Sequence, residues 1–135
     1  MIRTKEAYVS FETAKLLKKK GFDENTLMVY MSYGDLCKCN RYDSIRNSNY
    51  NDITKNYFEC TAPTHQMAMK WLREIYGIDI VIEISDPSVN DRKYYCVIWD
   101  KNNESHILEL FDSYEDAVEA ALKYCLKNIK RKYNL

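Results

Sequence analysis

The sequence contains little glycine or proline, with three Gly and two Pro among 135 residues. This scarcity excludes collagen-like repeats and linker-dominated chains, and a hydrophobic fraction of 46% excludes intrinsic disorder. No run of about 18 apolar residues occurs, so no segment has the pattern of a membrane-spanning helix. The first residues also lack the apolar stretch of a secretory signal. We therefore expect a cytoplasmic protein that does not associate with membranes.

A net charge is also missing, because 20 Lys and Arg residues balance 20 Asp and Glu residues. The balance hides an uneven distribution. Residues 1–20 carry six basic and two acidic side chains. Residues 79–119 carry three basic and eleven acidic side chains, and residues 120–135 carry five basic side chains and no acidic ones. Neutrality thus excludes a uniformly basic nucleic-acid binder, but it leaves open a local basic patch.

A length of 135 residues predicts a single domain over residues 1–135. Capping residues and apolar periodicity predict helices over residues 11–20, 64–76 and 114–129. Ser10 and Ser113 are the expected N-caps, and Gly21 and Gly77 are the expected left-handed residues at helix C-termini. Residues 43–56 are rich in Asn, Ser and Asp and predict a loop.

Strands are predicted where β-branched and aromatic residues gather or alternate with polar ones. These segments are residues 26–33, 36–42, 57–61, 78–84, 93–100 and 106–111. The order is α-β-β-(β)-α-β-β-β-α, without βαβ alternation. It predicts an α+β fold in which a hairpin and a three-stranded meander form antiparallel sheet covered by about three helices.

Three segments resemble a known family: YVSFETAKLLKKKGF, APTHQMAMKWLRE and YEDAVEAALKYCLKNI. They are similar, in the same order, to a family of small uncharacterised proteins encoded by gut bacteria and their phages or prophages. No activity is assigned to that family, so the resemblance implies no catalytic or cofactor-binding residue. It does imply a cytoplasmic accessory protein of a phage or mobile element.

The five cysteines are odd in number and follow no secretory signal, which indicates reduced thiols. Cys37, Cys39, Cys60 and His65 are the set that comes closest to a zinc site, provided that the fold brings them together. Their spacing departs from the usual C-x₂₋₄-C pairs, so we expect no metal. Cys60 before a helix, with a histidine as base, is an alternative nucleophile, but no family signature accompanies it.

Two surfaces are candidates for recognition. Lysines and an arginine near two helix ends could contact phosphates, although such residues also complement helix dipoles. They are Lys15, Lys18, Lys19, Lys20, Lys127, Lys130 and Arg131. The second surface is aromatic and consists of Tyr94, Tyr95 and Trp99.

No glycine-rich phosphate loop or assembled catalytic motif is present, and we expect no cofactor. The sequence therefore favours a small non-enzymatic protein that binds a protein partner. A nucleic-acid-binding module is the first alternative, and a small enzyme with a cysteine or carboxylate site is the second.

Overall fold

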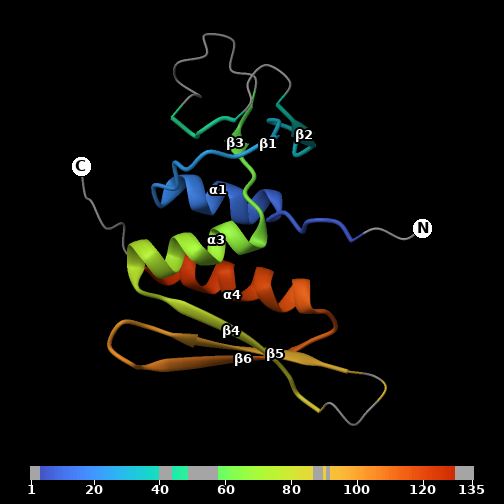
Figure 1. Ribbon diagram of the computed structural model, residues 1–135, viewed down its shortest axis with the longest axis vertical. Helices are drawn as coiled ribbons and strands as arrows, with labels where there is room; N and C mark the ends of the chain where they lie inside the picture. Colours follow the sequence, from blue (N-terminus) through green and yellow to red (C-terminus); the bar gives the residue numbers. More distant parts are fainter. Residues whose placement is uncertain (1–3, 40–43, 49–57, 87–89, 91, 130–135) are drawn as a thin grey trace. The chain divides into compact units, whose positions relative to one another are not determined.

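The computed structural model describes residues 4–39, 44–48, 58–86, 90 and 92–129 (Figure 1). The chain divides into two compact units, the first within Met1–Thr64 and the second within His65–Lys132. The element order is that predicted, with three helical segments and two antiparallel three-stranded sheets. The α+β class is confirmed. That residues 1–135 form a single domain stays a prediction.

The first unit begins with helix α1 (Phe11–Lys19). The Ser10 side chain caps it by accepting a hydrogen bond from the Thr13 backbone N–H, as predicted. At its end Gly21 has φ +99°, and the Phe22 N–H donates to the Leu17 carbonyl. Together with the bond from the Gly21 N–H to the Lys18 carbonyl, this is the Schellman ending expected from the sequence.

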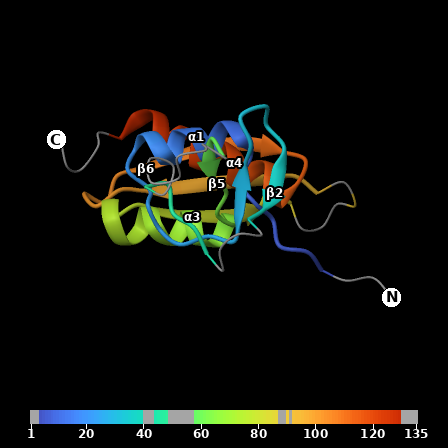
Figure 2. The ribbon, with the colours of Figure 1, turned by 90° about the horizontal axis from the view of Figure 1, so that it is seen from above.

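The first sheet has the order β2-β1-β3 and consists of β1 (Met28–Tyr30), β2 (Leu36–Lys38) and β3 (Cys60–Thr61). Strands β1 and β2 form the predicted hairpin, coloured light blue to cyan in Figure 2, but all three strands are shorter than expected. Strand β3 pairs with the other edge of β1.

One face of this sheet packs a small core of Val29, Ile45 and Phe58. Ile45 lies in the segment predicted as a loop, yet it is buried and its backbone pairs with that of Thr26. Residues 44–48 are the described part of this segment. The rest of the predicted loop lies outside the described residues.

The second unit begins with α3 (His65–Trp71), which continues as a π-helical turn, η1 (Leu72–Tyr76). It ends at Gly77, which is left-handed as expected. The apolar periodicity of the sequence predicts a buried stripe of Met67, Ala68, Trp71, Leu72 and Ile75. Ala68, Trp71 and Leu72 are buried, but Met67 is 37% exposed and Met69 is buried. The observed stripe runs through positions i, i+3, i+4 and i+7, namely His65, Ala68, Met69 and Leu72.

The second sheet is the predicted meander, with the order β4-β5-β6. Its strands are β4 (Asp79–Ile84), β5 (Tyr94–Trp99) and β6 (Ser105–Phe111). Helix α4 (Tyr114–Asn128), capped by Ser113, lies across one face of this sheet, and α3 packs on α4 (Figure 1). The periodicity of the sequence predicts a stripe of Val118, Ala121, Leu122, Cys125 and Ile129. Because α4 contacts both the sheet and α3, its buried surface is wider and also includes Ala117 and Leu126.

Candidate functional site

The surface with the clearest recognition chemistry is the face of the β4-β5-β6 sheet opposite α4, which we call the open face. Side chains alternate between the two faces of a strand, and paired residues share a face. Cys96 and Ile98 are buried, and the His106 and Tyr124 rings lie 5.5 Å apart, so these positions face α4. The open face therefore carries the odd-numbered positions: Asp79, Val81, Glu83, Tyr95, Val97, Trp99, Ser105 and Ile107.

An apolar row crosses the middle of the open face. Val81 pairs with Val97, and Val97 pairs with Ile107, so three branched aliphatic side chains lie side by side across all three strands. Val81 is 39% exposed and Ile107 is 57% exposed. Such a row is normally buried beneath a second layer, and in the described part of the second unit no helix covers it (Figure 1).

Aromatic side chains extend this row along the central strand. Trp99 and Tyr95 lie two residues to either side of Val97 on the same face, and Trp99 is 42% exposed. Tyr94 lies on the opposite face, where its ring meets that of Tyr114 on α4 at 6.3 Å. Of the three aromatic residues proposed from the sequence, the structure thus brings together Tyr95 and Trp99 and separates Tyr94 from them.

A β-bulge ends the regular part of the open face. Tyr94 pairs with Phe111 and Cys96 with Leu108, so one β5 residue opposes both Glu109 and Leu110. The extra residue shifts the alternation by one position and turns Phe111 towards α4. Leu110 remains 55% exposed beside the bulge. The aliphatic members of the open face were missed at first, although the alternation of residues 78–84 already placed Val81 between two carboxylates.

The candidate basic residues fall into two groups, one in each unit. On α1, the Lys18 ammonium donates to the Glu59 carbonyl at 2.6 Å, and that of Lys15 lies 4.4 Å from the centre of the Phe11 ring. Both lysines therefore have partners within the fold. Lys19, Lys20 and Lys127 lie near helix C-termini, whereas Lys130 and Arg131 lie outside the described residues.

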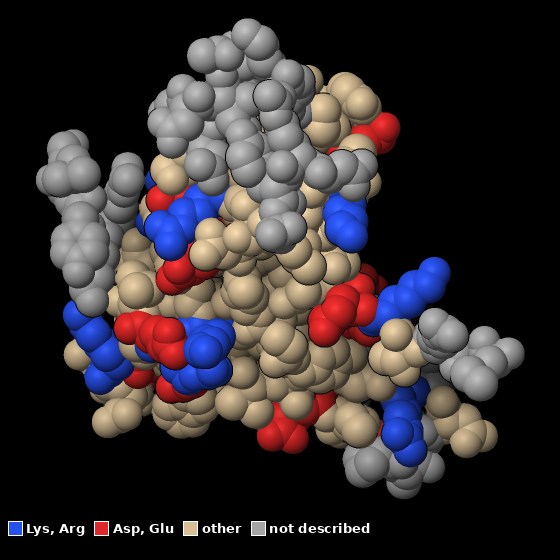
Figure 3. Space-filling model, turned by 45° about the horizontal axis from the view of Figure 1, so that its top comes forward, with Lys and Arg blue, Asp and Glu red and all other residues tan. Residues whose placement is uncertain are grey.

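Basic and acidic side chains are interspersed on the face shown in Figure 3, where Lys and Arg are blue and Asp and Glu are red. Nucleic-acid binding through the helix ends stays a prediction.

The sheet register separates the cysteines that were considered as zinc ligands. Cys37 pairs with Val29 and Cys60 with Tyr30, and these neighbours on β1 point to opposite faces. Cys39 packs against the Val29 cluster. Among the residues with assigned positions, no group of three or more His, Cys, Asp or Glu side chains could hold a metal ion.

Cys60 also lacks the environment of a nucleophile. It is fully buried, and this burial raises the pKa of its thiol to about 12 despite the nearby positive charges of Lys18 and Lys15. At neutral pH the thiol therefore stays protonated, and a thiol is far less nucleophilic than a thiolate. Burial likewise raises the pKa of Cys125 to about 12.

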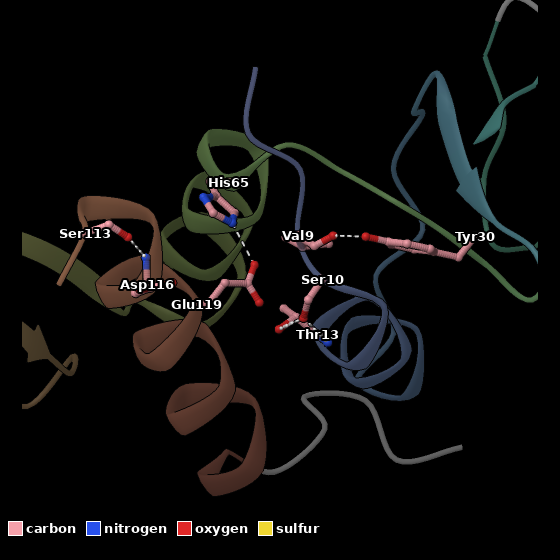
Figure 4. A network of polar contacts seen from close by, with 8 residues as sticks. All are labelled: Val9, Ser10, Thr13, Tyr30, His65, Ser113, Asp116 and Glu119. Atoms are coloured by element: carbon pink, nitrogen blue, oxygen red, sulfur yellow. Dashed lines mark hydrogen bonds and ion pairs between the residues drawn. The ribbon is translucent and has the colours of Figure 1, made fainter. Parts of the chain in front are cut away.

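His65 is paired rather than free to act as a base. It lies in the first turn of α3, as the sequence predicts, and is buried, with its Nε2 2.7 Å from Oε2 of Glu119 on α4 (Figure 4). This pair joins the start of α3 to the second turn of α4 within the second unit. Figure 4 also shows the two serine caps, the bond between the Ser10 and Thr13 hydroxyls, and the bond from the Tyr30 hydroxyl to the Val9 carbonyl.

Comparison of the chain with protein-family models, with curated proteins and with solved structures finds no match. No helix in the described part of the chain combines the length and apolar character needed to cross a membrane.

Proposed function

We propose that this protein is a non-enzymatic accessory protein that binds a protein partner through the open face. The observation that carries the proposal is the exposed Val81–Val97–Ile107 row, flanked by Tyr95 and Trp99. Burying aliphatic side chains that lie in register across a whole sheet beneath a second layer removes them from water, which is energetically favourable. Tryptophan and tyrosine beside such a row are the side chains enriched among energetic hot spots of protein interfaces.

The acidic character of residues 79–119, which contain the meander and the start of α4, favours a protein partner over nucleic acid for this face. Residues 79–119 carry eleven acidic and three basic side chains, which repel a phosphate backbone. The resemblance to phage and prophage proteins supports an accessory role in the cytoplasm of a bacterial host. Both the phage origin and the cytoplasmic location belong to this proposal.

Comparative affinity capture tests the proposal. A tagged wild-type protein and an Ile107→Ser variant are incubated with the same bacterial lysate, and bound proteins are quantified by mass spectrometry. Leu27→Ser in the first unit is the matched control, because Leu27 is 56% exposed and Ile107 is 57% exposed. Thermal unfolding of all three proteins verifies that each is folded.

We expect a defined set of proteins to bind to the wild type and the Leu27→Ser variant and to be depleted on the Ile107→Ser variant. Equal capture by all three folded proteins contradicts the proposal. A Trp99→Ala variant provides a second, independent substitution on the same face, and it is expected to deplete the same proteins.

A further inference from the structure

We infer that the open face takes a cationic amphipathic helix, in which lysine or arginine side chains flank an apolar stripe. The inference rests on the proposed function and specifies the chemistry of its partner. Three features of the face lead to it: the position of its carboxylates, the absence of compensating cations among its strand residues, and the size of its apolar row.

The carboxylates border the apolar row on strand β4. Asp79 and Glu83 lie two residues to either side of Val81, all three on the open face, and both acidic residues are exposed. At about 3.4 Å per residue, the two carboxylate-bearing positions are roughly 14 Å apart along the strand. A partner that covers Val81 therefore brings its own flanking side chains close to both carboxylates.

No lysine or arginine occupies a strand position of the open face. The ammonium of Lys93, just before β5, is bound by the carboxylate of Asp112, which neutralises it locally. The turn after β5 contributes the side chains of Asp100, Lys101 and Glu104, so its net charge is negative. At the end where Lys93 lies, the exposed cation Arg92 stands beside two exposed carboxylates, Glu83 and Asp86. The described charges around the row are therefore acidic on balance, and a cationic partner complements them.

A second copy of this chain is disfavoured as the partner of the open face, because it would carry the same negative charge. Stacking two open faces would bring together two surfaces with the same negative balance, and like charges in a desolvated interface are costly. An anionic membrane surface is disfavoured by the same repulsion.

The dimensions of the row fit a helix. Three strands at a spacing of about 4.8 Å make the row roughly 10 Å wide, which matches the diameter of an α-helix with its side chains. The other face of this sheet is already covered by an amphipathic helix, α4, which presents Val118, Leu122 and Cys125 among its buried residues. A partner helix would complete a helix–sheet–helix sandwich.

A matched pair of synthetic peptides tests the inference. Both are 18-residue helices with the same leucine stripe, and their polar positions carry lysine in one peptide and glutamate in the other. Binding is followed through tryptophan fluorescence of the intact protein, because Trp99 is 42% exposed whereas Trp71 is 7% exposed. A Trp99→Phe variant identifies the part of the signal that comes from the open face.

We expect the lysine peptide to bind at least about tenfold more tightly than the glutamate peptide at low ionic strength. Added salt is expected to reduce this difference in affinity. An Asp79→Lys/Glu83→Lys variant is expected to reverse the preference. The control, Glu6→Lys/Glu24→Lys, makes the same change in charge at two exposed positions of the first unit and is expected to keep the wild-type preference.

The inference is overturned if the two peptides bind equally, if neither binds, or if both double variants change the preference alike. Its failure can be distinguished from failure of the proposed function. If Ile107→Ser still depletes captured proteins while the peptides show no charge preference, the face binds proteins but the cationic helix is wrong. If Ile107→Ser depletes nothing, the proposed function itself fails.

Discussion

His65 and Glu119 form a hydrogen-bonded pair, with Nε2 of the imidazole 2.7 Å from Oε2 of the carboxylate. Their side chains are 7% and 19% exposed, respectively, so the bond is largely shielded from water. The pair connects the first residue of α3 to the second turn of α4, although 54 residues separate the two in the chain. It therefore fixes how the two helices of the second unit pack above the sheet.

The first prediction is that Glu119→Ala lowers the free energy of unfolding by about 1–3 kcal/mol, because it leaves the buried imidazole without its partner. Urea denaturation measures the loss. Glu119→Gln keeps an acceptor oxygen, so its free energy of unfolding is expected to fall by less than that of Glu119→Ala.

Glu115→Ala is the control, because Glu115 is exposed in the first turn of the same helix. This substitution makes the same change in helix propensity without removing a partner of His65. An equal loss in the Glu119→Ala and Glu115→Ala variants would show that the pair contributes no net stability.

Asn47 has a comparable role in the first unit. Its amide nitrogen donates to the Phe22 carbonyl, and its amide oxygen accepts from the Thr61 backbone N–H, both at 2.8 Å. One buried side chain thus joins the end of α1 to strand β3.

We predict that Asn47→Ala destabilises the protein by about 1–3 kcal/mol, because both backbone groups lose their partner in a buried site. Ser48→Ala, at the exposed neighbouring position, is expected to change the free energy of unfolding by less than about 0.5 kcal/mol. Chemical denaturation of both variants checks the prediction, and similar midpoints for the two would contradict it.

Local signals in the sequence predicted much of the fold. The caps at Ser10 and Ser113, the left-handed glycines at positions 21 and 77, and the alternation of β4 all act within a few residues, so the sequence pattern indicates them directly. The strand order of the meander followed from its short connections.

Features that depend on distant partners were not predicted. The burial of Ile45 and Asn47 depends on contacts with segments about 15 to 25 residues away, and their neighbours have loop-like composition. The predicted stripe of α3 includes Met67 where the structure buries Met69, because both phases of the helix offer apolar residues and only the tertiary packing distinguishes them. The bulge in β6 was likewise not predicted, whereas the separation of Tyr94 from Tyr95 and Trp99 follows from the alternation of β5 itself.

The buried thiols predict a pH-dependent stability. Burial raises the pKa of Cys60 and Cys125 from 9.0 to about 12. Between these two values the unfolded thiols ionise while the folded thiols remain protonated, so a rise in pH stabilises the unfolded state relative to the folded one. The stability associated with both thiols is therefore fully present below pH 9 and is lost as the pH approaches 12.

We expect a Cys60→Ala/Cys125→Ala variant to lose stability less steeply than the wild type between pH 9 and 11, as measured by urea denaturation at each pH. Iodoacetamide labelling of the native protein at pH 8 provides a second measurement. Cys37 and Cys39, which are partly exposed, are expected to be alkylated well before the buried Cys60 and Cys125. Parallel stability profiles and uniform labelling would both contradict the assigned environments.

Gly77 links the helical segment to the strand that carries the acidic border of the open face. Its φ is +68°, and a Cβ added there would lie 3.1 Å from the Cβ of Lys101. We predict that Gly77→Ala destabilises the protein by about 1–2 kcal/mol, because an alanine is strained in the left-handed conformation and its methyl group meets this side chain. Gly77→Asn is expected to lose less stability than Gly77→Ala, since asparagine tolerates the left-handed conformation better than alanine. Thermal unfolding of both variants tests the order: if Gly77→Ala unfolds at the wild-type temperature, the left-handed turn is not required to start β4.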